Sequence, residues 1–208
     1  MAAEQPKEIS DREFFGACCC CLAILAGIAS LIYLIVLLSI SKHATYSVTV
    51  AGAAGLDPAA DLSSAAALSP VFNLTFHIDN SRDRLSSACV TRFASAAVSY
   101  GDAFLAKGSV PQFCARPRKV RERGARAWGD GVALPRFLRG QLAREMAAGE
   151  AAVHVEVTMP GNGCDAFGCY DTVLICSDAK IGGGPARCRE ETVYHRHQQA
   201  EPAPGSTN

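Results

Sequence analysis

Residues 71–78 read VFNLTFHI, with an apolar side chain at every second position. Successive side chains of a β-strand point to opposite faces, so this period of two predicts a strand with one buried and one polar face. Strands of this kind are typical of antiparallel sheets, which can bury one face and leave the other in water. The expected buried face holds Phe72, Leu74, Phe76 and Ile78, and the polar face holds Asn73, Thr75 and His77.

Shorter segments with the same strand pattern lie on both sides of this one. Residues 135–148 are different, because Leu138, Leu142 and Met146 recur every four residues and predict one amphipathic helix that ends at Gly149. Six to eight short strands with one helix predict a mainly β fold, an immunoglobulin- or fibronectin-like antiparallel β-sandwich. The other expected strands are 45–50, 89–93, 96–100, 103–107, 110–113, 152–159 and 172–179.

Composition predicts where this domain begins and ends. We expect the sandwich to cover residues 42–188, a length that can bury one hydrophobic core. Residues 51–70 are rich in Ala, Gly, Ser and Pro and predict a loop or linker within it. The polar residues 189–208 show no period and predict a disordered tail, and residues 1–17 form a short leader.

Residues 22–40 read LAILAGIASLIYLIVLLSI and contain no charge. With the preceding cysteines they predict a single transmembrane helix over residues 18–41, because about 19 helical residues span roughly 28 Å. A cleaved secretory signal would have a shorter apolar core behind a basic leader, whereas this leader is rich in acids. The flanking basic residues slightly favour a cytosolic N-terminus and an extracytosolic sandwich. We expect the membrane to be the plasma membrane.

Two features of the apolar segment suggest further properties. Small residues at a spacing of four, Ala23 with Gly27 and Ala26 with Ser30, allow close helix approach and could support a homo-oligomer. Consecutive cysteines at the membrane edge are candidate acylation sites, although they can also be plain apolar residues. These cysteines are Cys18, Cys19, Cys20 and Cys21.

Six more cysteines lie in the expected extracytosolic part of the chain. An even number in an oxidising compartment predicts disulfides, with 15 possible connectivities. Local bridges Cys164–Cys169 and Cys176–Cys188 are plausible. A zinc site would need tighter Cys or His pairs, so we expect no metal. The six disulfide candidates are Cys89, Cys114, Cys164, Cys169, Cys176 and Cys188.

Two polar motifs suggest surface sites. Asn73-Leu74-Thr75 is a glycosylation sequon on the polar face of the expected strand, so Asn73 is the predicted acceptor. The stretch RPRKVRERGAR at 116–126 could bind an anionic surface such as wall polysaccharide or lipid headgroups, or it could be a solvated loop. Its basic residues are Arg116, Arg118, Lys119, Arg121, Arg123 and Arg126.

Charge and motifs exclude several functions. The 208-residue chain has 20 basic and 20 acidic residues, and it carries no nucleic-acid recognition motif, so we expect no nucleic-acid partner. It has no G-x-S-x-G, no H-E-x-x-H and no phosphate-binding loop, and residues 79–83 begin like a calcium loop but lack its later ligands. His77 and His154 lie on polar strand faces. The sequence therefore predicts a non-enzymatic protein without a cofactor.

Four segments, taken in order, carry a resemblance to a known family. The segments are VFNLTFHIDN (71–80), AAVSYGDAFLAKGSVPQF (96–113), LPRFLRGQLAREMAAGEAAVHVEV (134–157) and DTVLICSDAKIGG (171–183). With them the chain resembles the plant late-embryogenesis-abundant group 2 proteins, in their hairpin-induced and non-race-specific disease-resistance-like branch. The resemblance implies a membrane-anchored β-sandwich at the cell surface, with a role in defence or stress signalling or in contact between wall and membrane. The alternative is a sandwich that binds a lipid or small molecule between its sheets.

Overall fold

The structure is a computed structural model that describes residues 23–36, 43–63, 67–165 and 168–195. The chain divides into two compact units, Met1–Lys42 and His43–Asn208. The second unit holds the β structure and one helix, and the first holds a separate helix over residues 23–36.

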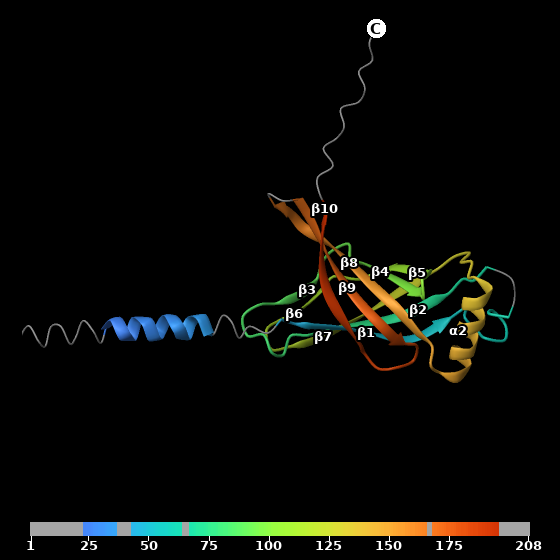
Figure 1. The fold of residues 1–208 in the computed structure, drawn as a ribbon, viewed down its shortest axis with the longest axis horizontal. Coiled ribbons are helices and arrows are strands. Elements are labelled where there is room, and N and C mark those ends of the chain that lie inside the picture. Colours follow the sequence, from blue (N-terminus) through green and yellow to red (C-terminus); the bar gives the residue numbers. More distant parts are fainter. Residues whose placement is uncertain (1–22, 37–42, 64–66, 166–167, 196–208) are drawn as a thin grey trace, which may run out of the picture. The chain divides into compact units, whose positions relative to one another are not determined.

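Eight strands of the second unit form a closed antiparallel barrel in the order β1-β10-β9-β8-β4-β5-β7-β2 (Figure 1). Two further strands, β3 and β6, pair with each other and lie at one end of the barrel, while helix α2 lies at the other end (Figure 1). The strands are β1 (Thr45–Ala54), β2 (Val71–Asp79), β3 (Ala88–Val90), β4 (Ser95–Tyr100), β5 (Ala103–Ser109), β6 (Phe113–Ala115), β7 (Val120–Trp128), β8 (Ala152–Asp165), β9 (Gly168–Lys180) and β10 (Ala186–His195), and the helix is α2 (Arg136–Ala148).

The predicted β-sandwich is wrong, because the sheet closes on itself instead of splitting into two. Alternation along a strand tells which side chains face inward, and it is the same in a sandwich and in a barrel. Closure occurs where Lys107 of β5 pairs with Trp128 of β7. Two glycines allow the backbones to meet there. A Cβ on Gly108 would lie 1.9 Å from the Arg126 carbonyl oxygen, and one on Gly129 would lie 2.0 Å from the Leu105 carbonyl oxygen.

The predicted transmembrane helix over residues 18–41 is also corrected. Within that range the structure describes a helix over residues 23–36 with exposed side chains. In the described ranges of the chain, no helix combines the length and apolarity that a membrane crossing needs. The predicted acylation sites Cys18, Cys19, Cys20 and Cys21 lie outside the described residues.

The core confirms the strand and helix patterns that the sequence shows most clearly. The predicted inner face of residues 71–78 is buried, with Phe72 and Ile78 fully inaccessible to solvent. Helix α2 buries Leu142 against the same core and ends at Gly149, whose φ of 69° is in the left-handed region that glycine tolerates. The inward side chains of the barrel thus form one packed cluster.

Three segments differ from the prediction. Within the predicted linker 51–70, residues 51–54 extend β1, and leucines at 56, 62 and 68 are buried in the core. Residues 120–126 of the basic stretch belong to strand β7, and the predicted tail contributes residues 189–195 to β10. Each of these segments is fixed by a neighbouring strand or by the core. Their own sequences lack a clear period, so pattern alone could not predict them.

Alkaline pH is expected to destabilise the barrel through two tyrosines, Tyr100, which is buried, and Tyr46, which is half-buried. Burial raises the pKa of Tyr46 to about 12, with the nearby Glu190 adding to the effect, and burial likewise raises the pKa of Tyr100 to about 12. Because an unfolded tyrosine has a pKa of about 10, the unfolded chain ionises first. The contribution of these two phenols to the free energy of unfolding is therefore complete below about pH 10 and is lost as the pH rises toward about 12. Denaturant titrations across this range measure the fall.

The control for this prediction is the double variant Tyr46→Phe with Tyr100→Phe. It keeps both rings and removes both ionisations, so its unfolding free energy is expected to change less with alkaline pH than that of the unaltered chain. An equal decline in the variant would contradict the role of these two phenols.

Candidate functional site

An open hollow of about 940 Å³ lies where β5 meets β7 and is lined by residues from both strands and from two loops. Three aromatic side chains line it, and all three are exposed: Phe93 by 87%, Trp128 by 59% and Phe104 by 52%. Exposed aromatic rings that gather around one hollow mark an interaction site, whereas scattered apolar residues are ordinary on a protein surface. This aromatic hollow is the strongest candidate site of the described residues.

Local backbone features place these rings outside the barrel. The pairing of β4 with β5 shifts register between Val98 and Ser99, which marks a bulge. Because of it, the adjacent residues Leu105 and Ala106 are both buried, and the residues on either side of them face solvent. A bulge often re-aims side chains in this way next to a functional site. It turns Phe104 and Lys107 outward together.

Phe93 reaches the hollow from the loop that precedes β4. Its φ of 62° is in the left-handed region, which is uncommon for a residue with a Cβ. The next residue, Ala94, is buried, so the turn holds the ring outside while the chain continues into the core. A backbone conformation of this kind costs about 1–3 kcal/mol, which other contacts in the fold must offset. Residues in such conformations are often found at functional sites.

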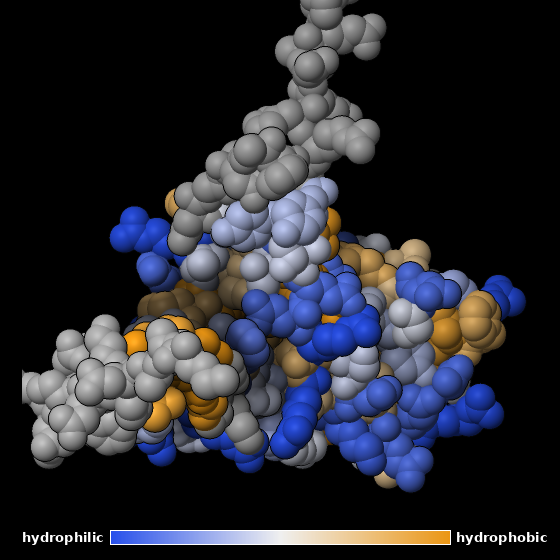
Figure 2. Space-filling model, turned by 60° about the vertical axis from the view of Figure 1, so that its left-hand side comes forward, coloured by the Kyte–Doolittle hydropathy of each residue, from blue (hydrophilic) through white to orange (hydrophobic). Residues whose placement is uncertain are grey.

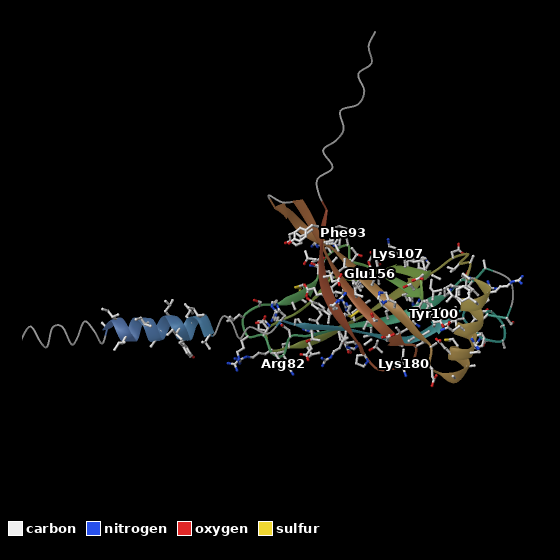
Figure 3. All side chains as sticks on the ribbon, in the orientation of Figure 1. Arg82, Phe93, Tyr100, Lys107, Glu156 and Lys180 are labelled. Carbon is white, nitrogen blue, oxygen red and sulfur yellow. A yellow bond between two sulfur atoms is a disulfide. The ribbon has the colours of Figure 1, made fainter. Side chains whose placement is uncertain are left out.

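Polar groups surround the aromatic rings. Ser95 and Ser109 are direct cross-strand neighbours on β4 and β5, and both line the hollow. Lys107 lies opposite Trp128, and Asp130 follows Trp128 by two residues. The positive charge of Lys107 and the negative charge of Asp130 therefore balance within the hollow. Figure 3 shows Phe93 and Lys107 along the same margin of the barrel. Mostly apolar walls with a few polar groups are typical of small-ligand sites.

Sequence reasoning missed this site entirely. The three rings lie far apart in the chain, and each belongs to a segment that looked like an ordinary strand or loop. The only signal was local: Phe104 and Leu105 are adjacent apolar residues that interrupt the alternation of their strand. Which of the two faces solvent depends on the bulge, and a bulge cannot be placed without its partner strand.

Asn73 lies on the outer face of β2 and is exposed, as the sequence predicts. Its two cross-strand neighbours are Gly52 on β1 and Arg126 on β7. Gly52 presents no side chain, and no atom lies within 4 Å of the Cβ position it lacks. The Arg126 Nε donates a hydrogen bond to the Asn73 Oδ1 at 3.3 Å. The surface around the sequon is therefore open enough for a glycan.

We expect Asn73 to carry an N-linked glycan when the protein is made in a secretory pathway. Endoglycosidase treatment is expected to increase gel mobility, and Asn73→Gln and Thr75→Ala are each expected to abolish that change. Thr75→Ser is the matched control, because it keeps the sequon and should keep the mobility change. No change for the unaltered protein would contradict the prediction.

Among the residues whose side chains the structure describes, two disulfides form, which confirms the predicted disulfides for four of the six candidate cysteines. Cys89–Cys114 joins β3 to β6, and Cys176–Cys188 joins β9 to β10, as the sequence suggested for the second pair. In both cases the cysteines are direct cross-strand neighbours, with Cα atoms 4.1 and 4.0 Å apart. Cys164 and Cys169 also face each other in the register of β8 and β9, and their side chains lie outside the described residues.

A short polar chain on the outer face of the barrel joins three strands. His77 Nε2 lies 3.1 Å from the Thr49 hydroxyl, and its Nδ1 lies 3.3 Å from a carboxylate oxygen of Glu122. Hydroxyl, imidazole and carboxylate in this order occur in nucleophilic enzymes. Catalysis would also need donors aimed at an oxyanion. Strand β2, which carries His77, is paired with neighbours on both sides, so its own backbone N–H groups are already used.

The six basic residues predicted as one patch divide between two faces. Arg126 lies beside Asn73, as described above. Arg121 and Arg123 lie opposite Ile78 and Phe76 in the register of β7 and β2, and so share the other face of the sheet. The three remaining residues, Arg116, Arg118 and Lys119, lie in the exposed connection between β6 and β7.

Neither comparison with known proteins nor a search for metal ligands identifies a function. No family model, curated protein or solved structure matches the chain. Across the described ranges, no group of three His, Cys, Asp or Glu side chains is placed to hold a metal ion. The chemistry of the aromatic hollow is therefore the basis on which a function can be proposed.

Proposed function

We propose that this protein is a non-enzymatic binding domain that works outside the cytosol at the cell surface and holds a neutral oligosaccharide in its aromatic hollow. The observation that carries the proposal is the set of exposed rings, Phe93, Phe104 and Trp128, around one open hollow. Leaving three aromatic rings in water costs free energy that ligand binding can recover.

The ligand class follows from the shape and charge of the hollow. An aromatic ring has an electron-rich face, which attracts the weakly positive C–H groups on the flat side of a sugar ring. The hydroxyls at the edge of the sugar can bond to Ser95, Ser109 and the charged side chains of the rim. Because Lys107 and Asp130 balance each other, the hollow favours an uncharged ligand.

The proposed location rests on the cysteines. Disulfides persist in oxidising compartments and are rare in the cytosol, so two cross-strand bridges support a domain outside the cytosol. The resemblance to late-embryogenesis-abundant group 2 proteins supports the plasma membrane as the site of action. It also supports a role in defence or stress responses, or in contact between wall and membrane. A glycan ligand is consistent with that last role.

The other two functions considered from the sequence have less support. A lipid between two sheets would need an internal cavity, and the inward side chains of this barrel pack as one cluster. A hydrolase would need an oxyanion site beside His77, and strand β2 offers no free donor pair there. We therefore propose no enzymatic activity.

Fluorescence tests the proposal directly, because Trp128 is the only tryptophan in the chain. We expect cellohexaose or xyloglucan oligosaccharides to shift its emission saturably. Phe93→Ala and Phe104→Ala are each expected to weaken binding about tenfold, since an aromatic contact of this kind contributes more than 1 kcal/mol.

Phe137→Ala is the matched control for this titration. Phe137 is 72% exposed on α2, at the far end of the barrel from β3 and β6, and does not line the hollow. Its loss should leave the affinity unchanged. Absence of a saturable shift with either sugar, or equal binding by the Phe93→Ala variant, would refute the proposed site.

A further inference from the structure

We propose a second binding surface, the basic end of the barrel, and infer that it binds an acidic polysaccharide through its carboxylates. It shares with the proposed function the location outside the cytosol, and it does not involve the aromatic hollow. The basic end consists of Arg82, Arg84, Arg116, Arg118, Lys119, Arg121 and Arg123, all of them exposed.

Backbone hydrogen bonds bring these residues together from two distant segments. The Arg118 N–H donates to the carbonyl oxygens of Asn80 and Asp83, both at 3.0 Å, and the Asn80 N–H donates to the Lys119 carbonyl oxygen at 3.1 Å. The loop that follows β2 is thereby joined to the loop that precedes β7. Figure 3 shows Arg82 at this end of the barrel, and Figure 2, in which this side comes forward, shows strongly hydrophilic groups beside neutral and apolar ones.

The loop that carries Arg82 and Arg84 is held in place. Asn80 is only 1% exposed, and its side-chain Nδ2 donates to the carbonyl oxygens of Ser86 at 2.8 Å and Ala115 at 3.2 Å. The Cys89–Cys114 disulfide fixes the strands behind it. A surface already ordered before binding loses less conformational entropy when a ligand arrives.

The seven basic residues at this end outnumber the acids. Residues 79–86 and 116–123 hold only three acidic side chains. Asp79 accepts from the Ser81 N–H at 2.9 Å, Asp83 accepts from the Leu85 N–H at 2.8 Å, and Glu122 pairs with His77. Hydrogen bonds from Ser81 lower the pKa of Asp79, and backbone hydrogen bonds from Leu85 and Ser86 lower the pKa of Asp83.

The basic side chains remain available for a ligand. Within the described ranges, none of the seven forms an ion pair with an acid. Seven basic residues against three acids leave an excess of positive charge, which creates a positive potential that attracts polyanions. Six of the seven are arginines, whose planar guanidinium groups match carboxylates with two parallel hydrogen bonds.

The spacing of the cations favours a polymer over a single anion. Arg121 and Arg123 are two residues apart on β7, so their side chains leave the same face about 6.7 Å apart. A row of this kind fits a chain with repeated carboxylates. A lipid surface is the other polyanion to consider, but anionic lipids are concentrated in the cytoplasmic leaflet, away from an oxidising compartment.

Retention on immobilised polygalacturonate tests the inference on the full chain. We expect binding at low salt that weakens steadily as salt rises, and little binding to the fully methyl-esterified polymer, which has lost its charges. The double variant Arg121→Gln with Arg123→Gln is expected to bind at least about tenfold more weakly. Both side chains are exposed, so this change should leave the fold intact.

Two control variants test whether binding depends on the basic end itself. One removes positive charge elsewhere, and the other alters the aromatic hollow. Lys180→Gln with Arg144→Gln removes two exposed cations outside the basic end and should leave the affinity within about twofold. Trp128→Ala should also have no effect, which keeps failure of this inference distinct from failure of the proposed function. The inference is overturned if both polymers bind equally or if both double variants bind alike. It is also overturned if phosphatidylserine vesicles are bound more tightly than polygalacturonate.

Discussion

Gly108→Ala is expected to lower the free energy of unfolding by about 3 kcal/mol or more, a large part of the stability of an ordinary domain. The added Cβ would lie 1.9 Å from the Arg126 carbonyl oxygen and 2.8 Å from the Ala127 Cα. Both are backbone atoms of β7, so no side chain can move aside and the barrel must open or shift. Denaturant unfolding of the variant measures the loss.

Gly140→Ala is the matched control, and its effect should have the opposite sign. Gly140 lies on the exposed side of α2, and no atom is within 4 Å of its missing Cβ. Replacing glycine by alanine inside a helix stabilises by about 0.5–1 kcal/mol. If Gly108→Ala were as stable as the unaltered chain, β5 could not cross β7 as closely as the structure has it.

Removal of the Cys89–Cys114 disulfide is expected to have the second-largest effect. The bridge closes a loop with a sequence separation of 25. By restricting the unfolded chain, a loop of this length is expected to stabilise the folded state by about 3 kcal/mol. In a domain of this size the melting temperature should fall by roughly 6–12 °C. The double variant Cys89→Ala with Cys114→Ala, measured by calorimetry, isolates this bridge.

The Cys176–Cys188 bridge provides the comparison. It spans a separation of 12, so the same reasoning gives a slightly smaller cost for Cys176→Ala with Cys188→Ala. Reductant should lower the melting temperature of the unaltered chain and have less effect on each double variant. A melting temperature that does not respond to reductant would contradict both bridges and remove the main support for an oxidising compartment.

The elements that could be predicted were those whose own sequence fixes their burial. Residues 71–78 alternate cleanly because β2 lies between two strands with one face on the core. Helix α2 has a clear period of four because it places one side, around Leu142, against the same core. In both cases the apolar residues recur with the period of the element because they form its buried face.

The remaining elements depend on partners that no local pattern contains. Strand β7 shows no alternation, because Arg121 and Arg123 are exposed although they pair with the buried residues Ile78 and Phe76. The leucines at 56, 62 and 68 are too far apart to form a period, although all three are buried. Closure of the barrel and the aromatic hollow both depend on a single crossing of β5 and β7, which strand periodicity cannot reveal.

That crossing is therefore the central claim, and backbone NMR contacts test it most directly. In the labelled full chain, we expect through-space contacts between the backbone protons of Lys107 and Trp128, because these residues are cross-strand partners. Contacts of Ala97 with Lys107 and of Val71 with Trp128 should flank them. If the flanking contacts are present and the Lys107–Trp128 contact is absent, the sheet is open between β5 and β7, and the hollow proposed as the binding site does not exist.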